Sequence, residues 1–109
     1  MKDDKLYLIH IIECIERIES YTARMEKDAF MASTLQQDAV IRNLQIMAES
    51  IQRLSNEAKE KHLEIDWYKI AGFRNILVHD YLGVDTEKIW NILKNEIPPL
   101  KKTILKMKG

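Results

Sequence analysis

The segment at residues 72–85, GFRNILVHDYLGVD, contains three side chains that together could act on a phosphodiester. Arg74, His79 and Tyr81 fall within eight residues of a mostly apolar stretch. A guanidinium binds phosphate oxygens through a planar fork of donors and keeps its charge. An imidazole can take a proton from a ribose 2′-hydroxyl near neutral pH. Arg74 and His79 could therefore cleave RNA without a metal and leave a 2′,3′-cyclic phosphate.

Two neighbouring side chains could support this chemistry. Asn75 could hold the His79 ring or a phosphate, and Tyr81 could bond the phosphate or stack on a base. Arg74 and Tyr81 are seven residues apart and share a helix face, whereas Arg74 and His79 are about 140° apart around a straight helix. Bringing Arg74 and His79 to one small group requires a distorted helix end near His79, or a partner chain that closes a cleft over both.

The same residues also allow an interpretation without chemistry. Arg74 could form an ion pair with Asp80 or with Glu87. His79 could be an interface histidine with its hydrogen bonds satisfied, and Tyr81 could be a packing residue. The spacing alone leaves both interpretations open.

The other candidate ligands and nucleophiles in the sequence are isolated. His10 and His62 have no second ligand at zinc spacing, so we expect them to be surface or packing residues and expect no metal site. Cys14, the only cysteine, lies in an apolar segment and is expected to be buried and inert. No glycine-rich phosphate loop is present, and no cofactor is expected. The basic C-terminal end is expected to be a solvated face, with an RNA backbone contact as the alternative; its residues are Lys94, Lys101, Lys102, Lys106 and Lys108.

Composition predicts a single helical domain at residues 1–109. Apolar residues make up 46% of the 109 residues and charged residues 31%, which is typical of a folded, soluble protein. Only three glycines and two prolines occur, which favours long uninterrupted helices. The net charge is zero, so no global field attracts nucleic acid or a membrane. Without a signal sequence or a run of about 18 apolar residues, we expect a cytoplasmic protein with no membrane partner.

Apolar residues at helical spacing predict an all-α, up-down bundle of four to five helices. The first helix is expected at residues 3–27 and the second at residues 33–59, with a short helical turn at 28–32 before it. Further helices are expected at residues 67–81 and 85–95, followed by a short last helix. The two long helices carry apolar seams that could also pair with a second copy, which favours a homodimer.

Polar and special residues mark the expected helix ends. Ser33 or Thr34 is a plausible cap for the second helix, and Asp66 for the third. Gly83 can end the third helix, and Asp85 or Thr86 can cap the fourth. Pro98 and Pro99 are expected to break the fourth helix, and Pro99 can sit in the first turn of the last one.

Two stretches of the sequence resemble the HepT-like toxins of the HEPN superfamily. The first is DAVIRNLQIMAES at residues 38–50, and the second runs from WYKIAGFRNILVHDYLGVD through IWNIL to PPL at residues 67–100. The Arg-x4-His-x-Tyr motif, in its Gly-Phe-Arg-Asn context, is the most specific part of the match. Asp38, Arg42 and Asn43 match polar positions of the family. The chain departs mildly from the family at residues 48–50 and lacks a proline shortly before Trp67.

The resemblance implies a HEPN-like helical-bundle dimer with the motif in the dimer cleft. Members of this family act as metal-independent ribonucleases or translation-blocking toxins. Each is encoded beside a minimal nucleotidyltransferase antitoxin, which can attach AMP to the motif tyrosine. Carried over by position, Arg74 and His79 become the catalytic pair, Asn75 a supporting residue and Tyr81 the modification target. RNA is then the expected substrate. The alternative is a non-catalytic HEPN module that binds a nucleotide or a partner.

Overall fold

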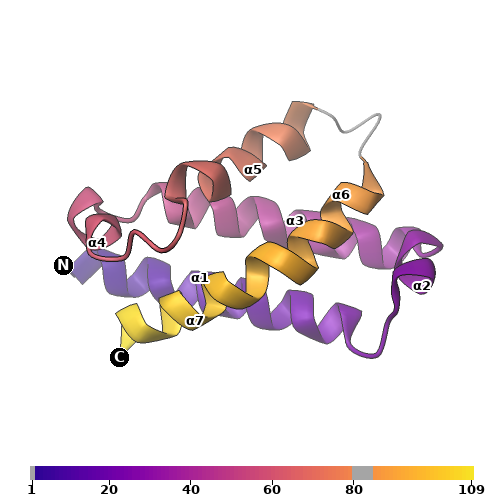
Figure 1. The fold of residues 1–109 in the computed structure, drawn as a ribbon, viewed down its shortest axis with the longest axis horizontal. Coiled ribbons are helices and arrows are strands. Elements are labelled where there is room, and N and C mark those ends of the chain that lie inside the picture. The colour runs from indigo at the N-terminus through magenta and orange to yellow at the C-terminus, as the bar shows by residue number, and fades with distance from the viewer. Residues whose placement is uncertain (1, 80–84) are drawn as a thin grey trace.

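The fold is described from a computed structural model, which covers the backbone of residues 2–79 and 85–109 and the side chains of residues 4–74 and 85–109. Seven α-helices and one π-helical turn account for the regular structure of these residues, and no strand occurs among them. The predicted all-α class is therefore confirmed. Four long rods (α1, α3, α5 and the continuous α6–η1–α7) and two short helices (α2 and α4) build the bundle (Figure 1).

Helix α1 (Lys2–Thr22) buries the predicted apolar stripe, with Ile11 and Ile15 completely inaccessible to solvent. The helix ends at Thr22, so its predicted extension to Lys27 is wrong. Arg24 adopts a left-handed backbone (φ 67°), which an α-helix cannot contain. The chain turns there and enters α2 (Lys27–Met31), which confirms the predicted short helical turn.

Helix α3 (Thr34–Gln52) is capped by Ser33, whose hydroxyl accepts a hydrogen bond from the Gln36 amide at 3.4 Å. Its predicted seam is buried in the core at Val40, Leu44, Met47 and Ile51. The helix ends seven residues before the predicted end at residue 59. The next residues instead turn at Arg53 and Leu54 and enter the separate helix α4 (Asn56–Glu60).

A contact far away in sequence explains this early end. The amide and the hydroxyl of Ser55 both donate to the carboxylate of Asp4, at 2.8 and 2.6 Å. The same hydroxyl accepts from the Ala58 amide at 3.1 Å and so caps α4. An N-cap residue has extended rather than helical backbone, so α3 cannot continue through Ser55.

Helix α5 (Trp67–His79) begins at the predicted place. The Asp66 carboxylate accepts from the Lys69 amide at 3.0 Å, as expected of a cap. Trp67, Ile70 and Phe73 are buried in the core. The predicted end near Tyr81 and the role assigned to Gly83 lie outside the described residues.

The last rod differs from the prediction at its prolines. Helix α6 (Thr86–Asn91) is capped by Asp85, then passes through the π-helical turn η1 (Ile92–Glu96) into α7 (Ile97–Lys108) without a break. A proline has no amide hydrogen and its ring collides with the carbonyl four residues earlier in a regular α-helix. A π-helical turn changes this hydrogen-bond spacing, and Pro98 and Pro99 then occupy the first turn of α7, where their missing donors are not needed.

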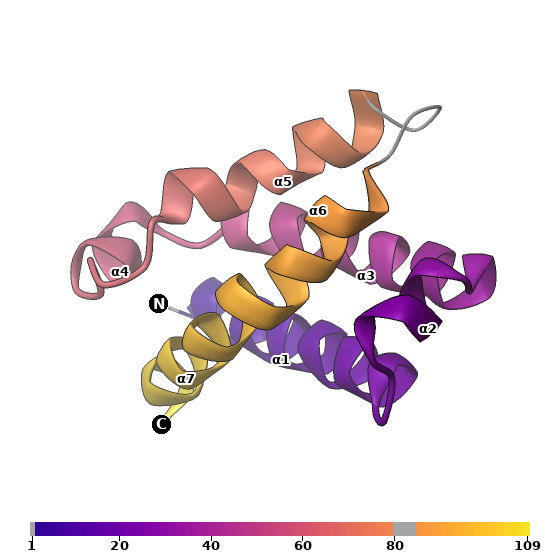
Figure 2. The same cartoon turned by 45° about the vertical axis from the view of Figure 1, so that its right-hand side comes forward.

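The helices enclose one connected cluster of buried apolar side chains. Helix α1 packs against α3 and α7, and α3 packs against α5. The short helix α2 contacts both α3 and α6 (Figures 1 and 2). Both tryptophans, Trp67 and Trp90, belong to the core, and Trp90 also packs on Phe30 with ring centroids 5.4 Å apart. In the part of the chain that the structure describes, no helix is both long and apolar enough to cross a membrane.

Candidate functional site

Helix α5 presents Arg74 to solvent from a stripe that is otherwise buried. Arg74 follows Trp67 by seven residues and Ile70 by four, so the three positions share one helix face. Trp67 and Ile70 are only 8% and 3% exposed, whereas Arg74 is exposed. The change follows from the path of α5, which begins close to α3 and moves away from it toward its C-terminal end (Figures 1 and 2). The positively charged Arg74 therefore lies where the inward face of α5 is no longer covered by the core.

Position 79 is the last residue of α5, and the helix is α-helical up to it. Five residues of α-helix separate positions 74 and 79 by about 140° around the axis and about 7.5 Å along it. The described part of α5 thus shows no distorted turn between the two positions. The side chains of Asn75 and His79, and Tyr81 as a whole, lie outside the described residues.

The suggested ion pair between Arg74 and Glu87 is not formed. Glu87 instead binds Lys27, with 2.7 Å between the ammonium nitrogen and the carboxylate oxygen, and so links α6 to α2. No acidic side chain among the described residues forms an ion pair with Arg74. The other suggested partner, Asp80, lies outside the described residues. Glu87 is therefore excluded as the ion-pair partner of Arg74.

The polar residues of α3 named above fall into two groups. Asp38 and Arg42 are exposed. Asn43 is buried, and its amide nitrogen donates to the Ala39 carbonyl at 2.9 Å. Asp38 and Arg42 are consequently available at the surface, while Asn43 is held against its own helix.

The isolated candidates are placed as the sequence predicts. His10 is exposed, and His62 is half-buried with its Nδ1 atom 3.6 Å from a carboxylate oxygen of Glu64. Cys14 is 1% exposed, and its burial raises the pKa of the thiol. Among the residues with described side chains, no group of three or more His, Cys, Asp or Glu is arranged to hold a metal.

Several lysines of the basic C-terminal end have their charges in contact with other side chains of the same chain. Two of its lysines form ion pairs and a third lies 4.5 Å from the centre of an aromatic ring; the pairs are Lys101 with Glu19, Lys106 with Glu64, and Lys94 with Trp90. These contacts favour the expected solvated face over an RNA contact at this end.

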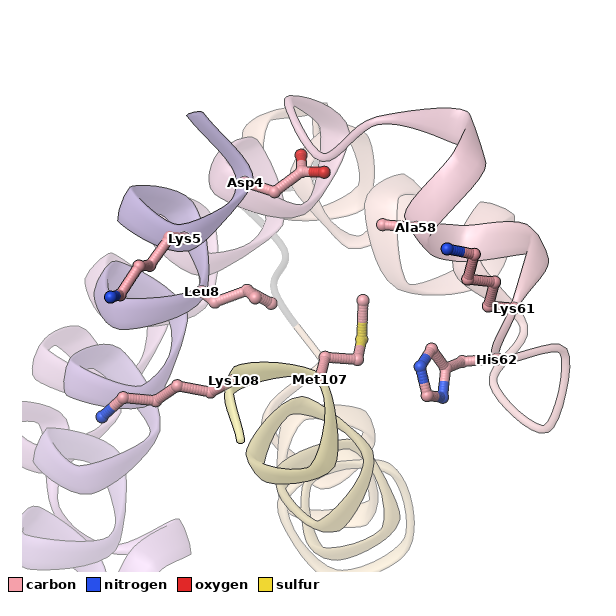
Figure 3. Close-up of a pocket in the computed structure, with 8 residues that line it drawn as sticks. All are labelled: Asp4, Lys5, Leu8, Ala58, Lys61, His62, Met107 and Lys108. Carbon is pink, nitrogen blue, oxygen red and sulfur yellow. The ribbon is translucent and has the colours of Figure 1, made fainter. Parts of the chain in front are cut away.

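A cavity of about 330 Å³ lies between the start of α1, α4 and the end of α7 (Figure 3). Its walls combine apolar, basic and acidic residues: Asp4, Lys5, Leu8, Ala58, Lys61, His62, Met107 and Lys108. The Asp4 carboxylate is already bound by Ser55, so it is not a free ligand. Both chain ends and α4 lie at this end of the molecule, whereas α5 ends at the other (Figure 1). The cavity is thus separate from Arg74 and the C-terminal end of α5.

Several curated proteins are similar to this chain. It is 39% identical over 100 residues to the "Probable ribonuclease HepT" of Thermococcus cleftensis, covering 92% of this chain and 91% of that protein. It is 32% identical over 103 residues to a "Putative RNase" of Methanocaldococcus jannaschii, covering 94% of each.

A third relative is longer. It is the "Gamma-glutamylcyclotransferase and putative RNase" of Methanocaldococcus jannaschii, which is 46% identical to this chain over 106 residues. The match covers 97% of this chain but 48% of that protein, so the chain spans about half the length of this relative. No solved structure matches the chain.

A family model matches most of the chain and agrees with the helical fold. A family model described as "Ribonuclease HepT-like" matches residues 11–107, a range that includes every helix from α2 to α6 and most of α1 and α7. The chain belongs to the HepT-like ribonuclease family of HEPN proteins.

Proposed function

We propose that this chain is a metal-independent endoribonuclease that uses Arg74 and His79, and that it is the toxin of a HEPN/nucleotidyltransferase toxin-antitoxin pair. One observation carries the proposal. In a member of the HepT-like ribonuclease family, an exposed arginine without a described acidic partner stands five residues before the histidine that ends α5.

The proposed reaction divides the work between the two residues. His79 takes the proton from a ribose 2′-hydroxyl, and the 2′-oxygen attacks the adjacent phosphorus. The bond from phosphorus to the 5′-oxygen of the next nucleotide breaks. That oxygen takes a proton from solvent, and His79 later returns its own proton to solvent. Arg74 binds the non-bridging oxygens, where negative charge develops. The products are a 2′,3′-cyclic phosphate and a 5′-hydroxyl.

Helix geometry supports a site shared between two copies. Positions 74 and 79 are about 140° apart around α5, so a single chain presents them in different directions. A homodimer with two-fold symmetry places two motifs at one groove, where Arg74 of one copy and His79 of its partner can approach the same phosphate. Asn75 would support the phosphate or the imidazole within that groove.

The proposed control of this activity is modification of Tyr81. A minimal nucleotidyltransferase would transfer AMP from ATP: the tyrosine oxygen attacks the α-phosphorus and pyrophosphate leaves. The added phosphate is an anion that Arg74 can bind, and the nucleotide occupies the groove that RNA must enter. A single modification would neutralise the cation and block the substrate.

A cleavage assay tests the proposal. The purified chain and its His79→Ala variant are incubated with RNA in EDTA, with His10→Ala as the matched control because His10 is an exposed histidine on another helix. We expect wild type and His10→Ala to cleave, and His79→Ala to lose at least about a hundredfold in rate. Full activity in His79→Ala would remove this residue from the reaction.

The second candidate function is binding without catalysis. The net charge of zero favours it, because the chain has no overall attraction for RNA. RNA or a nucleotide that binds the wild-type chain and remains uncleaved, with binding lost in Arg74→Ala, would support this alternative.

A further inference from the structure

Helix α3 carries an exposed row of four residues, which we call the α3 stripe: Leu35, Asp38, Arg42 and Ile46. Their spacings of three, four and four residues place them on one helix face. This face lies opposite the buried seam of the same helix. Leu35 is 76% exposed and Ile46 38%, so two aliphatic side chains flank the two charges in solvent.

The two charges of the α3 stripe differ from similar pairs elsewhere. Three other acid–base pairs at a spacing of four residues form ion pairs along their helices, Glu13 with Arg17, Glu49 with Arg53 and Glu57 with Lys61. Asp38 and Arg42 have the same spacing, yet neither forms an ion pair with any residue whose side chain is described. Their charges are therefore free to meet partners from another molecule.

The sequence of the stripe is complementary to itself. When a two-fold axis relates two antiparallel helices, residues at equal distances on either side of the axis face each other. The midpoint between Leu35 and Ile46 and the midpoint between Asp38 and Arg42 both fall at positions 40–41. With the axis at this level, Asp38 of each copy faces Arg42 of the other copy. Leu35 of each copy likewise faces Ile46 of the other copy.

We propose that the α3 stripe is the surface through which two copies of this chain pair, antiparallel about a two-fold axis near positions 40–41. In this antiparallel register, Asp38 of each copy faces Arg42 of the other. A parallel register would instead place Asp38 beside Asp38 and Arg42 beside Arg42. The proposal deepens the dimer of the proposed function by naming its contact surface.

The position of the stripe agrees with a shared site. Helix α3 begins beside α2, and α2 contacts α6, the helix that follows the motif segment in sequence. The N-terminal half of α3 and the C-terminal end of α5 therefore lie toward the same end of the molecule (Figure 1). The Leu35 end of the stripe therefore lies on the same half of each copy as the C-terminal end of α5.

A second pair of exposed apolar residues is a weaker candidate for the dimer surface. Leu63 and Tyr68 are 77% and 92% exposed. Two oppositely charged residues beside them, Glu64 and Lys69, are already paired within the chain with Lys106 and Glu96. These two charges are therefore not free to fix a register with a second copy.

Charge reversal tests the surface directly. Analytical ultracentrifugation measures the dimer affinity of wild type, Asp38→Arg, Arg42→Asp and the double variant Asp38→Arg/Arg42→Asp. Symmetry makes each single substitution create two like-charge contacts, so we expect each to weaken the dimer by at least about tenfold. The double variant should return to near the wild-type affinity. Arg17→Asp is the matched control, because it makes the same charge change at an exposed arginine of α1.

A mixture of the two single variants gives the most selective readout. Asp38→Arg chains and Arg42→Asp chains should each associate poorly alone and should form one-to-one dimers when mixed. Repair of a contact within one helix could not produce this result. A monomeric wild type, single variants as dimeric as wild type, or no association on mixing would each overturn the proposal.

RNA cleavage, measured on the same wild-type preparation, keeps this inference separate from the proposed activity. Cleavage by a wild type whose dimer is insensitive to charge reversal rejects the α3 stripe alone. If wild type does not cleave RNA but its dimer affinity responds to charge reversal as expected, the α3 stripe is supported and the ribonuclease activity is rejected.

Discussion

At the scale of single residues, Arg74 combines two properties. It occupies a position on the buried stripe of α5, and it is exposed without a described acidic partner. An exposed guanidinium contributes little to the fold, so its substitution should change the free energy of unfolding by no more than about 0.5 kcal/mol. A loss of activity at this position would then report on chemistry and not on stability.

We predict that Arg74→Lys loses at least about tenfold in the rate of RNA cleavage. The ammonium keeps the charge but cannot donate two parallel hydrogen bonds to a phosphate. Arg74→Ala should lose about a hundredfold or more, with an unchanged far-UV circular dichroism spectrum as evidence of folding. Equal rates for Arg74→Lys and wild type would show that a bidentate contact is not used.

The prediction for Tyr81 concerns its hydroxyl. Tyr81→Phe keeps the ring but removes the oxygen that would accept AMP, so this variant should remain toxic when its nucleotidyltransferase partner is present. Intact-mass spectrometry after incubation with the partner, ATP and Mg²⁺ should detect AMP on wild type only. AMP on Tyr81→Phe in equal amount, or none on wild type with its true partner, would contradict the prediction.

At the scale of elements, the link between Asp4 and Ser55 joins the start of α1 to the cap of α4. Ser55→Ala removes the cap and leaves the carboxylate without its hydroxyl donor, although the amide of residue 55 can still donate, so we expect a loss of about 1 kcal/mol or more in the free energy of unfolding. Chemical denaturation followed by circular dichroism measures it. Asn56→Ala, an exposed change within the same turn, serves as the control and should cost less.

The same link predicts a dependence of stability on pH. The hydrogen bond from the Ser55 hydroxyl, followed by that from its amide, lowers the pKa of Asp4 below its ordinary value of 3.8. A lowered pKa in the folded state stabilises the fold above the unfolded pKa, and this stabilisation is lost as the pH falls through the folded pKa. Wild type should therefore lose its advantage over Asp4→Asn between about pH 5 and strongly acidic conditions. A constant difference down to pH 2 would contradict this assignment.

Helix starts were more predictable than helix ends. Ser33, Asp66 and Asp85 act as caps at the predicted places because capping is a local interaction that side-chain type reveals. The end of α3 depends on Asp4, which is 51 residues away from Ser55, and no local pattern reveals such a contact. The continuous rod through Pro98 depends on a π-helical turn, which sequence periodicity does not distinguish from an α-helix.

The candidate site was predictable only in part for the same reason. Residue types and spacing predict Arg74 and His79 as site residues, and their roles stay a prediction. The structure adds that Arg74 is exposed and that Glu87 binds Lys27 instead. The exposed leucine and isoleucine of the α3 stripe gave no signal, because an apolar residue in an amphipathic helix is normally expected to face the core.

At the scale of the whole molecule, a shared site predicts complementation between inactive chains. In a mixed dimer of Arg74→Ala and His79→Ala, the intact Arg74 of one copy and the intact His79 of the other form one of the two Arg74–His79 pairs at the groove. Random exchange makes half of the dimers mixed, and each keeps one working pair of two, so about a quarter of wild-type activity should return. Activity that stays absent in a mixture of proven heterodimers would show that each site is built within one chain.

The most direct test of the proposed chemistry is the identity of the ends formed on RNA. Mass spectrometry of the products of wild-type cleavage in EDTA should find a 2′,3′-cyclic phosphate on one fragment and a 5′-hydroxyl on the other. An RNA with a single 2′-deoxynucleotide at the cleavage position should remain intact at that position, because the attacking oxygen is missing. Fragments with 5′-phosphates, or cleavage after the 2′-deoxynucleotide, would contradict attack by the ribose hydroxyl and the roles assigned to Arg74 and His79.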